Sequence, residues 1–234
     1  MAYQSIFKRY EIKFLLNQAQ LSAVLAAMAD HMAADQYGRT TICNVYYDTE
    51  HYQMIRRSIE KPVYKEKLRL RSYGPAGEHT PIFVELKKKY QGIVYKRRLS
   101  LPENTARNWL SGGTAPNDSQ IAREISYVRD HYTGIRPRMY LSYTRQAYFC
   151  KDDPDLRITL DTDILCRQDA LTLSAPPGGV PALDPALTLM EVKTPKALPL
   201  WLTQVLTQHK IYKTSFSKYG TAYEKMLKGE LQHA

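Results

Sequence analysis

Basic side chains at alternate positions are the most chemically informative feature of this sequence. The stretch VYKEKLRLRSYG covers residues 63–74, and every second position from 65 to 71 is a cation: Lys65, Lys67, Arg69 and Arg71. Successive side chains of a β-strand point to opposite faces, so this spacing predicts four cations along one face. Arginine offers a planar fork to two phosphate oxygens, and lysine offers a mobile point charge. The pattern therefore predicts a site for a polyanion.

The same alternation recurs in other segments with the composition of strands. Between residues 61 and 98 there are eleven basic residues and three acidic ones. The segments RYEIKF, FVELKKK, VYKRRL, LRITLD and LMEVKT each place cations on one predicted face, with single carboxylates among some of them. The charged residues on these faces are Arg9, Glu11, Lys13, Glu85, Lys87, Lys96, Arg98, Arg157, Asp161, Glu191 and Lys193.

Two interpretations of these faces are open from the residues alone. Charge alternation is typical of a solvated sheet exterior, and an exterior face usually mixes both signs. The faces here are mostly cationic, which favours a second arrangement in which they converge inside a barrel. Cations in a narrow lumen repel one another unless water or a polyanion fills it. We favour the lumen, which requires helices to cover the apolar outer faces.

The remaining sequence supplies elements for such a barrel. Apolar periodicity and turn residues predict strands at 8–16, 41–48, 64–73, 82–90, 93–101, 137–150, 156–165 and 187–194. They predict helices at 18–32 with Asn17 as N-cap, and at 106–110, 119–131, 200–208 and 218–228. Many strands joined by short connections favour an α+β fold with an antiparallel sheet closed on itself. We expect one domain over residues 1–234, with about eight strands and flanking helices.

Composition limits the function classes. The chain has 234 residues, 44% of them hydrophobic, and a formal net charge of +10, which points to an anionic partner. The three cysteines, Cys43, Cys150 and Cys166, are far apart, so a disulfide framework or zinc site is not expected. No apolar run reaches the ~20 residues of a membrane span, and no signal-peptide pattern is present. These features predict a cytoplasmic protein with no membrane span of its own.

Nine segments in order resemble the VTC (vacuolar transporter chaperone) domain, which covers polyphosphate polymerases among the triphosphate tunnel metalloenzymes. They are RYEIKFLL, YYDT, KLRLRSYG, FVELKKK, YKRRLSL, RPRMYLSYTRQAYF, LRITLDTDI, LMEVKTP and SFSKYGTAY. The resemblance extends over roughly residues 3–227. It implies an antiparallel β-barrel tunnel that binds a nucleotide triphosphate with Mn²⁺ or Mg²⁺, and ATP-driven growth of an inorganic polyphosphate chain. ATP, polyphosphate and pyrophosphate or phosphate are the implied ligands, and a membrane protein is a possible partner.

The resemblance also implies roles for single residues. The candidate catalytic side chains are Arg69, Arg71, Lys87, Arg145 and Lys218. Further phosphate ligands that it implies are Lys13, Lys96, Arg98, Arg157 and Ser217. Lys67 and Lys193 join the candidates because they share predicted strand faces with these charged residues. Glu191 matches the metal-binding glutamate of the family. Glu11 and Glu85 are further candidate metal ligands, for which ion pairing with neighbouring cations is an equally good interpretation.

Two positions depart from the pattern. Hydrolytic tunnel enzymes begin with Glu-x-Glu-x-Lys, and Arg9 occupies the first glutamate position here, which disfavours a triphosphatase. Some polymerases have a lysine just before the final Phe-Ser-Lys, where this chain has Ser215.

Three functions therefore stay under consideration. The favoured one is a metal-dependent polyphosphate polymerase, and the alternatives are a non-catalytic polyphosphate- or phosphate-binding module and a triphosphatase. Nucleic-acid binding is not expected, since no recognised motif accompanies the basic residues. The six histidines lie outside the nine segments, which suits a reaction whose nucleophile is already an anionic phosphate oxygen.

Overall fold

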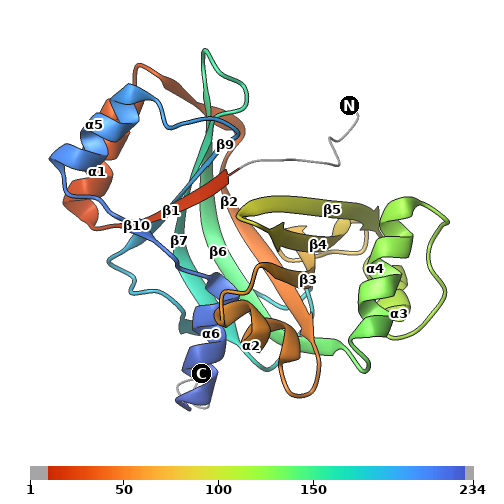
Figure 1. Ribbon diagram of the computed structural model, residues 1–234. Helices are drawn as coiled ribbons and strands as arrows, with labels where there is room; N and C mark the ends of the chain where they lie inside the picture. Colours follow the sequence, from red (N-terminus) through yellow and green to blue (C-terminus); the bar gives the residue numbers. More distant parts are fainter. Residues whose placement is uncertain (1–9, 230–234) are drawn as a thin grey trace.

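The computed structural model describes residues 10–229, and its centre is one strongly curled antiparallel sheet (Figure 1). The strands are β1 Tyr10–Leu16, β2 Met32–Asp48, β3 Tyr64–Tyr73, β4 Ile82–Tyr90, β5 Ile93–Leu101, β6 Arg136–Cys150, β7 Arg157–Arg167, β8 Val180–Pro181, β9 Thr188–Thr194 and β10 Lys213–Thr214. They pair in the order β10-β1-β9-β7-β6-β2-β3-β4-β5, and β8 pairs with β7. The prediction of an α+β fold built on an antiparallel sheet is confirmed. Lys8 and Arg9, assigned to the first strand from the sequence, lie outside the described residues.

The curl brings the two edges of the sheet together. β1 contacts β5 although the two strands lie near opposite ends of the pairing order. Lys87 on β4 forms an ion pair of 2.5 Å with Glu11 on β1 across this seam. Lys67 on β3 donates a hydrogen bond of 2.8 Å to Ser217, which follows β10. These contacts curl the sheet so that the charged faces of the strands turn toward one concave space, which we call the lumen.

Between residues 10 and 229, six helices surround the sheet (Figure 1). They are α1 Gln18–Met28, α2 Gln53–Ile59, α3 Glu103–Leu110, α4 Gln120–His131, α5 Leu200–Gln208 and α6 Lys218–Leu227. Figure 1 shows α1 beside α5 at one side of the sheet, α3 beside α4 at the opposite side, and α2 beside α6 below. None of the helices found between residues 10 and 229 combines the length and apolar character that a membrane crossing requires.

Two helix pairs cover the apolar outer faces, as the lumen interpretation requires. Leu68 and Leu70 of β3 pack with Trp109 of α3 and Ile125 of α4 in one buried cluster. A second cluster joins β1, β7 and β9 to α1 and α5; it contains Phe14, Ile158, Met190, Val192, Val24 and Leu202. Burying such side chains contributes about 1.5–3 kcal/mol each. The helices therefore hold the apolar faces outward and leave the charged faces to the interior.

The third helix pair closes part of the concave side. Tyr46 lies directly opposite Arg69 on the neighbouring strand, so both side chains project from the same face of the sheet. The ring of Tyr46 stacks on Tyr219 of α6, with 4.5 Å between the centroids. Ile55 of α2 belongs to the same buried cluster. This apolar and aromatic packing anchors α6 so that its first turn reaches the lumen.

The structure differs from the sequence prediction in several elements. The helix expected at 18–32 ends at Met28, and β2 begins at Met32 instead of residue 41. Just beyond this end, the Nζ of Lys151 donates hydrogen bonds to the carbonyl oxygens of Ala29 and Asp30, 3.0 Å each, so the turn after the helix is tied to the segment that follows β6. α2, β8 and β10 were not predicted. The N-terminus of α2 is satisfied by Asp48, whose carboxylate accepts the backbone N–H groups of Met54 and Ile55.

Candidate functional site

One half of the lumen is organised around the carboxylate of Glu85 on β4. Glu85 is 1% exposed and faces Arg69 on β3 and Arg98 on β5 in the sheet register. Arg69 donates to Oε2 over 2.9 and 2.6 Å, and Arg98 donates to Oε1 over 2.8 Å from Nε. Lys96 lies 2.6 Å from Oε1 and Arg71 lies 3.9 Å from it. Burial acts to raise the pKa of Glu85, but these four cations outweigh it and hold the pKa well below its usual value.

The other half is organised around Asp161 on β7 and Glu191 on β9. Arg145 donates two hydrogen bonds to Asp161, of 2.6 and 2.7 Å. Lys218, from the first turn of α6, lies 2.6 Å from Asp161 and 3.1 Å from Glu191. Glu191 also lies 3.3 Å from Arg145, 3.3 Å from Lys193 and 3.5 Å from Lys13. Four cations therefore surround each of the two half-site glutamates, Glu85 and Glu191.

Tyrosine and lysine side chains connect the two halves. The ring of Tyr143 lies 5.1 Å from the guanidinium carbon of Arg145 and 4.6 Å from the Nζ of Lys218. Burial acts to raise the pKa of Tyr143, yet Arg145 and Arg71, one from each half, bring that pKa below its usual value. Burial lowers the pKa of Lys67 well below its usual value, with Lys13 and other lumen cations acting in the same direction. The two halves are therefore electrostatically coupled.

The lumen carries a large excess of positive charge. Among residues 10–229, ten cations and four carboxylates line it, and all of them come from facing strands or from α6. The cations are Lys13, Lys67, Arg69, Arg71, Lys87, Lys96, Arg98, Arg145, Lys193 and Lys218; the carboxylates are Glu11, Glu85, Asp161 and Glu191. Burial of cations without sufficient counter-charge raises the free energy of the folded protein, and binding of an anion with several charges offsets that increase. The arrangement can bind a chain of linked phosphates.

The lowered pKa values of two lumen lysines indicate that their charged forms are unfavourable when no anion is bound. Burial lowers the pKa of Lys96 to about 7, although Glu85 acts in the opposite direction. Burial likewise lowers the pKa of Lys193 to about 8, against the effect of Glu191. Both lysines have a pKa of 10.5 in the absence of such an environment. Each therefore loses its proton more readily in the ligand-free lumen than in water.

Polyanion binding is consequently expected to take up protons near neutral pH. At pH 7.5 Lys96 and Lys193 together lack about one proton relative to their fully charged forms, and a bound polyanion raises both pKa values. Calorimetric titration of tripolyphosphate in buffers of different ionisation enthalpy measures the uptake. Lys96→Met is the control, because it removes most of this uptake and leaves the proton balance of the ligand itself unchanged. Equal uptake by the variant and the parent protein would contradict the assignment to Lys96.

The same shifts give the sign of the pH dependence of stability. Between about pH 7 and 10.5 the unfolded chain binds more protons at these lysines than the folded chain does. Their contribution therefore makes the ligand-free protein more stable as pH rises through this window. A polyanion that restores their charge is expected to stabilise the protein more at pH 6 than at pH 9, which thermal unfolding with and without tripolyphosphate measures.

Nearly all the residues singled out from the sequence meet in this lumen. Ser217 caps α6 by accepting the Gly220 N–H and also accepts the hydrogen bond from Lys67, which sets the helix N-terminus against the cations. Arg157 is the exception. It shares the lumen-side face with Thr159 and Asp161 but is exposed at the first position of β7, opposite Lys193. The structure thus places Arg157 at the rim, outside the two half-sites.

Sequence reasoning left three site residues out of the candidate list. Asp161 binds Arg145 and Lys218. It lies an even number of residues from Arg157 in the same strand, so the two share a face, and this spacing is the sequence feature that could have identified Asp161. Tyr143 and Tyr46 were not among the candidates. The hydroxyl of Tyr46 accepts a hydrogen bond of 3.0 Å from Arg69. Neither tyrosine has a sequence signal beyond its place in a strand.

The carboxylates do not form a ready-made site for a divalent metal. Within the described chain no group of three or more potential metal ligands comes together. Both oxygens of Glu191 already face cations, and Glu11 pairs with Lys87. For Glu85 and Glu11 these contacts match the ion-pair interpretation. A divalent ion would have to bring phosphate oxygens as most of its ligands and displace a lysine from a carboxylate.

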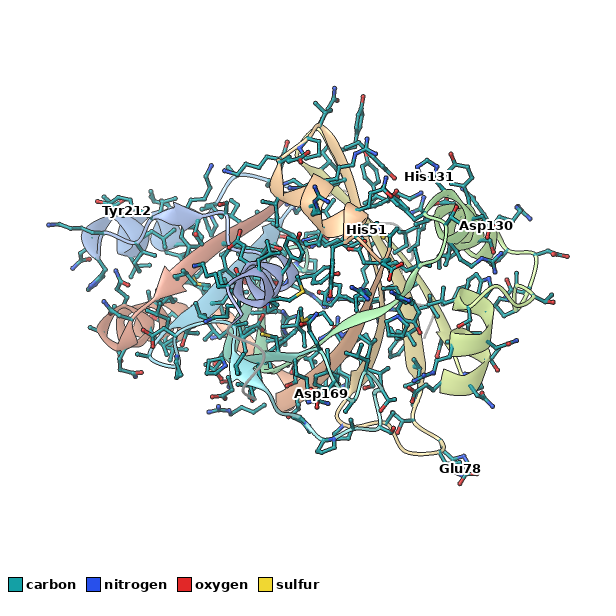
Figure 2. The ribbon with its side chains drawn as sticks, turned by 90° about the horizontal axis from the view of Figure 1, so that it is seen from below. His51, Glu78, Asp130, His131, Asp169 and Tyr212 are labelled. Atoms are coloured by element: carbon teal, nitrogen blue, oxygen red, sulfur yellow. The ribbon has the colours of Figure 1, made fainter. Side chains whose placement is uncertain are left out.

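The described histidines lie away from the lumen. His51, His79, His131 and His209 are exposed, and His31 stacks on Trp201 outside the barrel. Figure 2 shows His131 beside Asp130 on α4, at the periphery of the molecule. The sixth histidine, His233, lies outside the described residues. The side chains in the lumen are therefore suited to binding and orienting phosphates, and they include no imidazole among the residues described.

Comparison with known proteins agrees with this geometry. The family model described as VTC domain matches residues 8–227. Vacuolar transporter chaperone complex subunit 2 of Saccharomyces cerevisiae is 23% identical over 161 residues, covering 58% of this chain and 19% of the relative. The subunit 2 of Schizosaccharomyces pombe is 26% identical over 150 residues, covering 56% and 20%. The chain thus spans about a fifth of the length of these curated relatives.

Solved structures show the same fold at low sequence identity. A candidate adenylate cyclase from Bacillus halodurans superimposes with a TM-score of 0.55 and 13% identity, covering 92% of this chain and 96% of the other. A candidate adenylyl cyclase from Hippeastrum, reported to have a dominant triphosphatase activity, gives a TM-score of 0.56 and 14% identity, covering 93% and 96%. At these identities the likeness establishes the fold, and the chemistry has to be argued from the site.

Proposed function

The chain belongs to the VTC domain family, and on that basis we propose that it transfers the γ-phosphate of ATP to a growing inorganic polyphosphate chain inside the lumen. The observation that supports this proposal is that ten cations and four carboxylates of the described residues gather on the concave side of the curled sheet. Phosphoryl transfer requires alignment and charge neutralisation more than covalent chemistry from the protein. The lumen offers both.

The residues have distinct parts in the proposed reaction. Arg69 and Arg98 in one half, and Arg145 and Lys218 in the other, exchange their carboxylate contacts for phosphate oxygens. The transferred phosphoryl group lies between the halves. The bond from its phosphorus to the bridging oxygen of ADP breaks as a bond to the terminal oxygen of the acceptor chain forms. That acceptor oxygen is already anionic, so no general base is needed. Charge that develops on the leaving oxygen is stabilised by these fixed donors.

A divalent metal enters the proposal with the nucleotide. Mn²⁺ or Mg²⁺ bound to the phosphates would neutralise charge and hold their oxygens in place. Glu191 is the family-matched carboxylate, and Glu11 adjoins it because β1 pairs with β9. The chain itself contributes the cations that orient the substrate. Activity assays with each metal and with a chelator test this requirement.

A binding module without catalysis is the second candidate. The observation in its favour is that Glu85, Asp161 and Glu191 are all paired with cations, while no cluster of three metal ligands forms among residues 10–229. Such a module would hold polyphosphate without a metal. Glu191→Gln would then leave polyphosphate binding intact or strengthen it, because it removes a competitor for the same cations.

The deciding experiment combines synthesis with binding. Purified protein is incubated with ATP and Mn²⁺ or Mg²⁺, and products are separated by gel electrophoresis, while calorimetry measures binding of tripolyphosphate. Polymer synthesis that is lost in Glu191→Gln supports the polymerase. Binding without synthesis, by protein shown to be folded, supports the binding module. Orthophosphate release without polymer would support a triphosphatase.

The proposal extends to location and partners. The two curated relatives are named as subunits of a vacuolar transporter chaperone complex. We therefore expect the chain to act in the cytoplasm and to associate with a membrane-spanning partner that receives the polymer. Affinity purification from solubilised membranes, followed by identification of co-purifying proteins, tests this expectation.

A further inference from the structure

The cation rows of β3 and β4 continue beyond the lumen toward the hairpin between β4 and β5. In the register of the two strands, Arg69 faces Glu85, the next row on the same face pairs Lys67 with Lys87, and the last pairs Lys65 with Lys89. Consecutive rows are about 7 Å apart, because two residues of a strand span that length. Positive charge therefore runs in a line from the half-site at Glu85 to the end of the sheet.

The outermost row lacks the counter-charge that the inner rows have. Among residues 10–229, no carboxylate forms an ion pair with Lys65 or Lys89, whereas Lys87 pairs with Glu11. Burial lowers the pKa of Lys65, and Lys89 and Lys61 lower it further. Like charges directly opposite each other weaken a pair of strands. The repulsion in this row lowers stability, and no ion pair within residues 10–229 compensates for it.

Protection of a sheet edge does not explain these lysines. Lysines often mark edge strands, where they discourage pairing with other chains. β3 and β4 are interior strands, and β5 forms the edge of the sheet on this side. The neighbouring residue Lys88 shows the ordinary alternative, since it points to the opposite face and forms an ion pair of 3.0 Å with Glu124 of α4. Lys65 and Lys89 instead share the face of the lumen.

The side chain of Lys65 is also held in position. Its Nζ donates a hydrogen bond of 3.0 Å to the carbonyl oxygen of Ser58, at the end of α2. An ammonium group has three donors, so two remain for a ligand. Inward along the same strand, Lys67 is held by Ser217 at the beginning of α6. The α2 and α6 segments thus fix two successive cations of the line.

We propose that Lys65 and Lys89 form an outer subsite that binds the phosphates of a linear inorganic polyphosphate chain where that chain leaves the lumen. The assignment rests on the proposed function, because it extends the same binding line outward from Lys67. A ligand with evenly spaced charges and no bulky side groups suits a row of cations that continues outward from the lumen. Short phosphates that fit within the lumen do not reach this subsite.

Ligand length provides the test. The variant Lys65→Gln/Lys89→Gln is compared with the parent protein for binding of tripolyphosphate and of long-chain polyphosphate by calorimetry at low salt. Two partly exposed charge contacts are worth about 0.2–1 kcal/mol each, so the long chain is expected to bind about two- to thirtyfold more weakly. Tripolyphosphate affinity is expected to stay unchanged. The control Lys88→Gln/Lys210→Gln removes the same charge elsewhere, because Lys88 pairs with Glu124 on the opposite face and Lys210 is an exposed residue just after α5. It is expected to change neither affinity.

Each other outcome has a defined meaning. Unchanged affinity for the long chain, or equal weakening for both ligands, overturns the outer subsite. A parent protein that binds neither ligand refutes the proposed function together with the subsite. A single-stranded oligonucleotide that loses affinity in Lys65→Gln/Lys89→Gln, while long-chain polyphosphate does not, reassigns these lysines to nucleic acid and also overturns the proposal.

Discussion

Replacing Glu85 with glutamine is expected to destabilise the ligand-free protein by about 3–5 kcal/mol, the usual cost of removing one partner from a buried ion pair. Glu85 is almost fully buried and faces four cations. Glutamine preserves the size of the side chain but leaves those cations without their counter-charge. Deprotonation of Lys96, whose pKa is already about 7, offsets part of the cost. Chemical denaturation at pH 7 measures the change in the free energy of unfolding.

The matched control is Glu124→Gln on the outer face. Glu124 also pairs with two cations, Lys88 and Arg97, but it is more exposed, so a loss below about 1 kcal/mol is expected. Tripolyphosphate at about 100 times its Kd adds about 2.7 kcal/mol to the stability of a protein that binds it only when folded. At the same ligand concentration Glu85→Gln should gain more than the parent protein, because the phosphate no longer competes with a carboxylate. A loss as small as that of the control would show that Glu85 does not organise the cations.

Much of the fold follows from alternation in the sequence. The strands β3, β4 and β5 have the predicted bounds because segments with the composition of strands lie between turns that contain Gly or Pro, and in β3 apolar and charged residues alternate regularly. The excess of positive charge on one face of these strands then predicted that this face turns toward the lumen. Leu68 and Leu70 pack under α3 and α4, while Arg69 faces the lumen, as the alternation requires.

Contacts between distant segments explain what the sequence did not show. The N-cap position of α2 is Tyr52, at a φ of 56°, and the acceptor for its first N–H groups is Asp48, several residues earlier. A local search for a capping residue therefore misses the helix. Similarly, the bond from Lys67 to Ser217 joins residues 150 positions apart. Neither α6 as a wall of the lumen nor Asp161 as a partner of Lys218 could be derived without the register of β6, β7 and β9.

Among the lumen arginines described, Arg71 is the least engaged with a carboxylate and so the most available to bind a phosphate. Arg69, Arg98 and Arg145 each donate two hydrogen bonds to a carboxylate. Arg71 lies 3.9 Å from Glu85, and its Nε is buried without a hydrogen-bond partner among the described residues. Asn44, directly opposite on β2, also has a buried and unpartnered side-chain oxygen. An unpaired donor in a buried site costs free energy unless a ligand or water satisfies it.

Arg71→Ala is therefore expected to reduce polymer synthesis by at least about 100-fold, the effect of removing one donor that stabilises transition-state charge. The free energy of unfolding should change by no more than about 1 kcal/mol, because relief of repulsion in the ligand-free lumen offsets the lost packing of the side-chain stem. Arg71→Lys keeps the charge without the planar fork, so intermediate activity is expected. Arg97→Ala is the matched control on the opposite face of β5, where Arg97 pairs with Glu124, and near-normal synthesis is expected. Equal activities of the Arg71 and Arg97 variants, with both proteins folded, would mean that Arg71 does not contact the transferred phosphate.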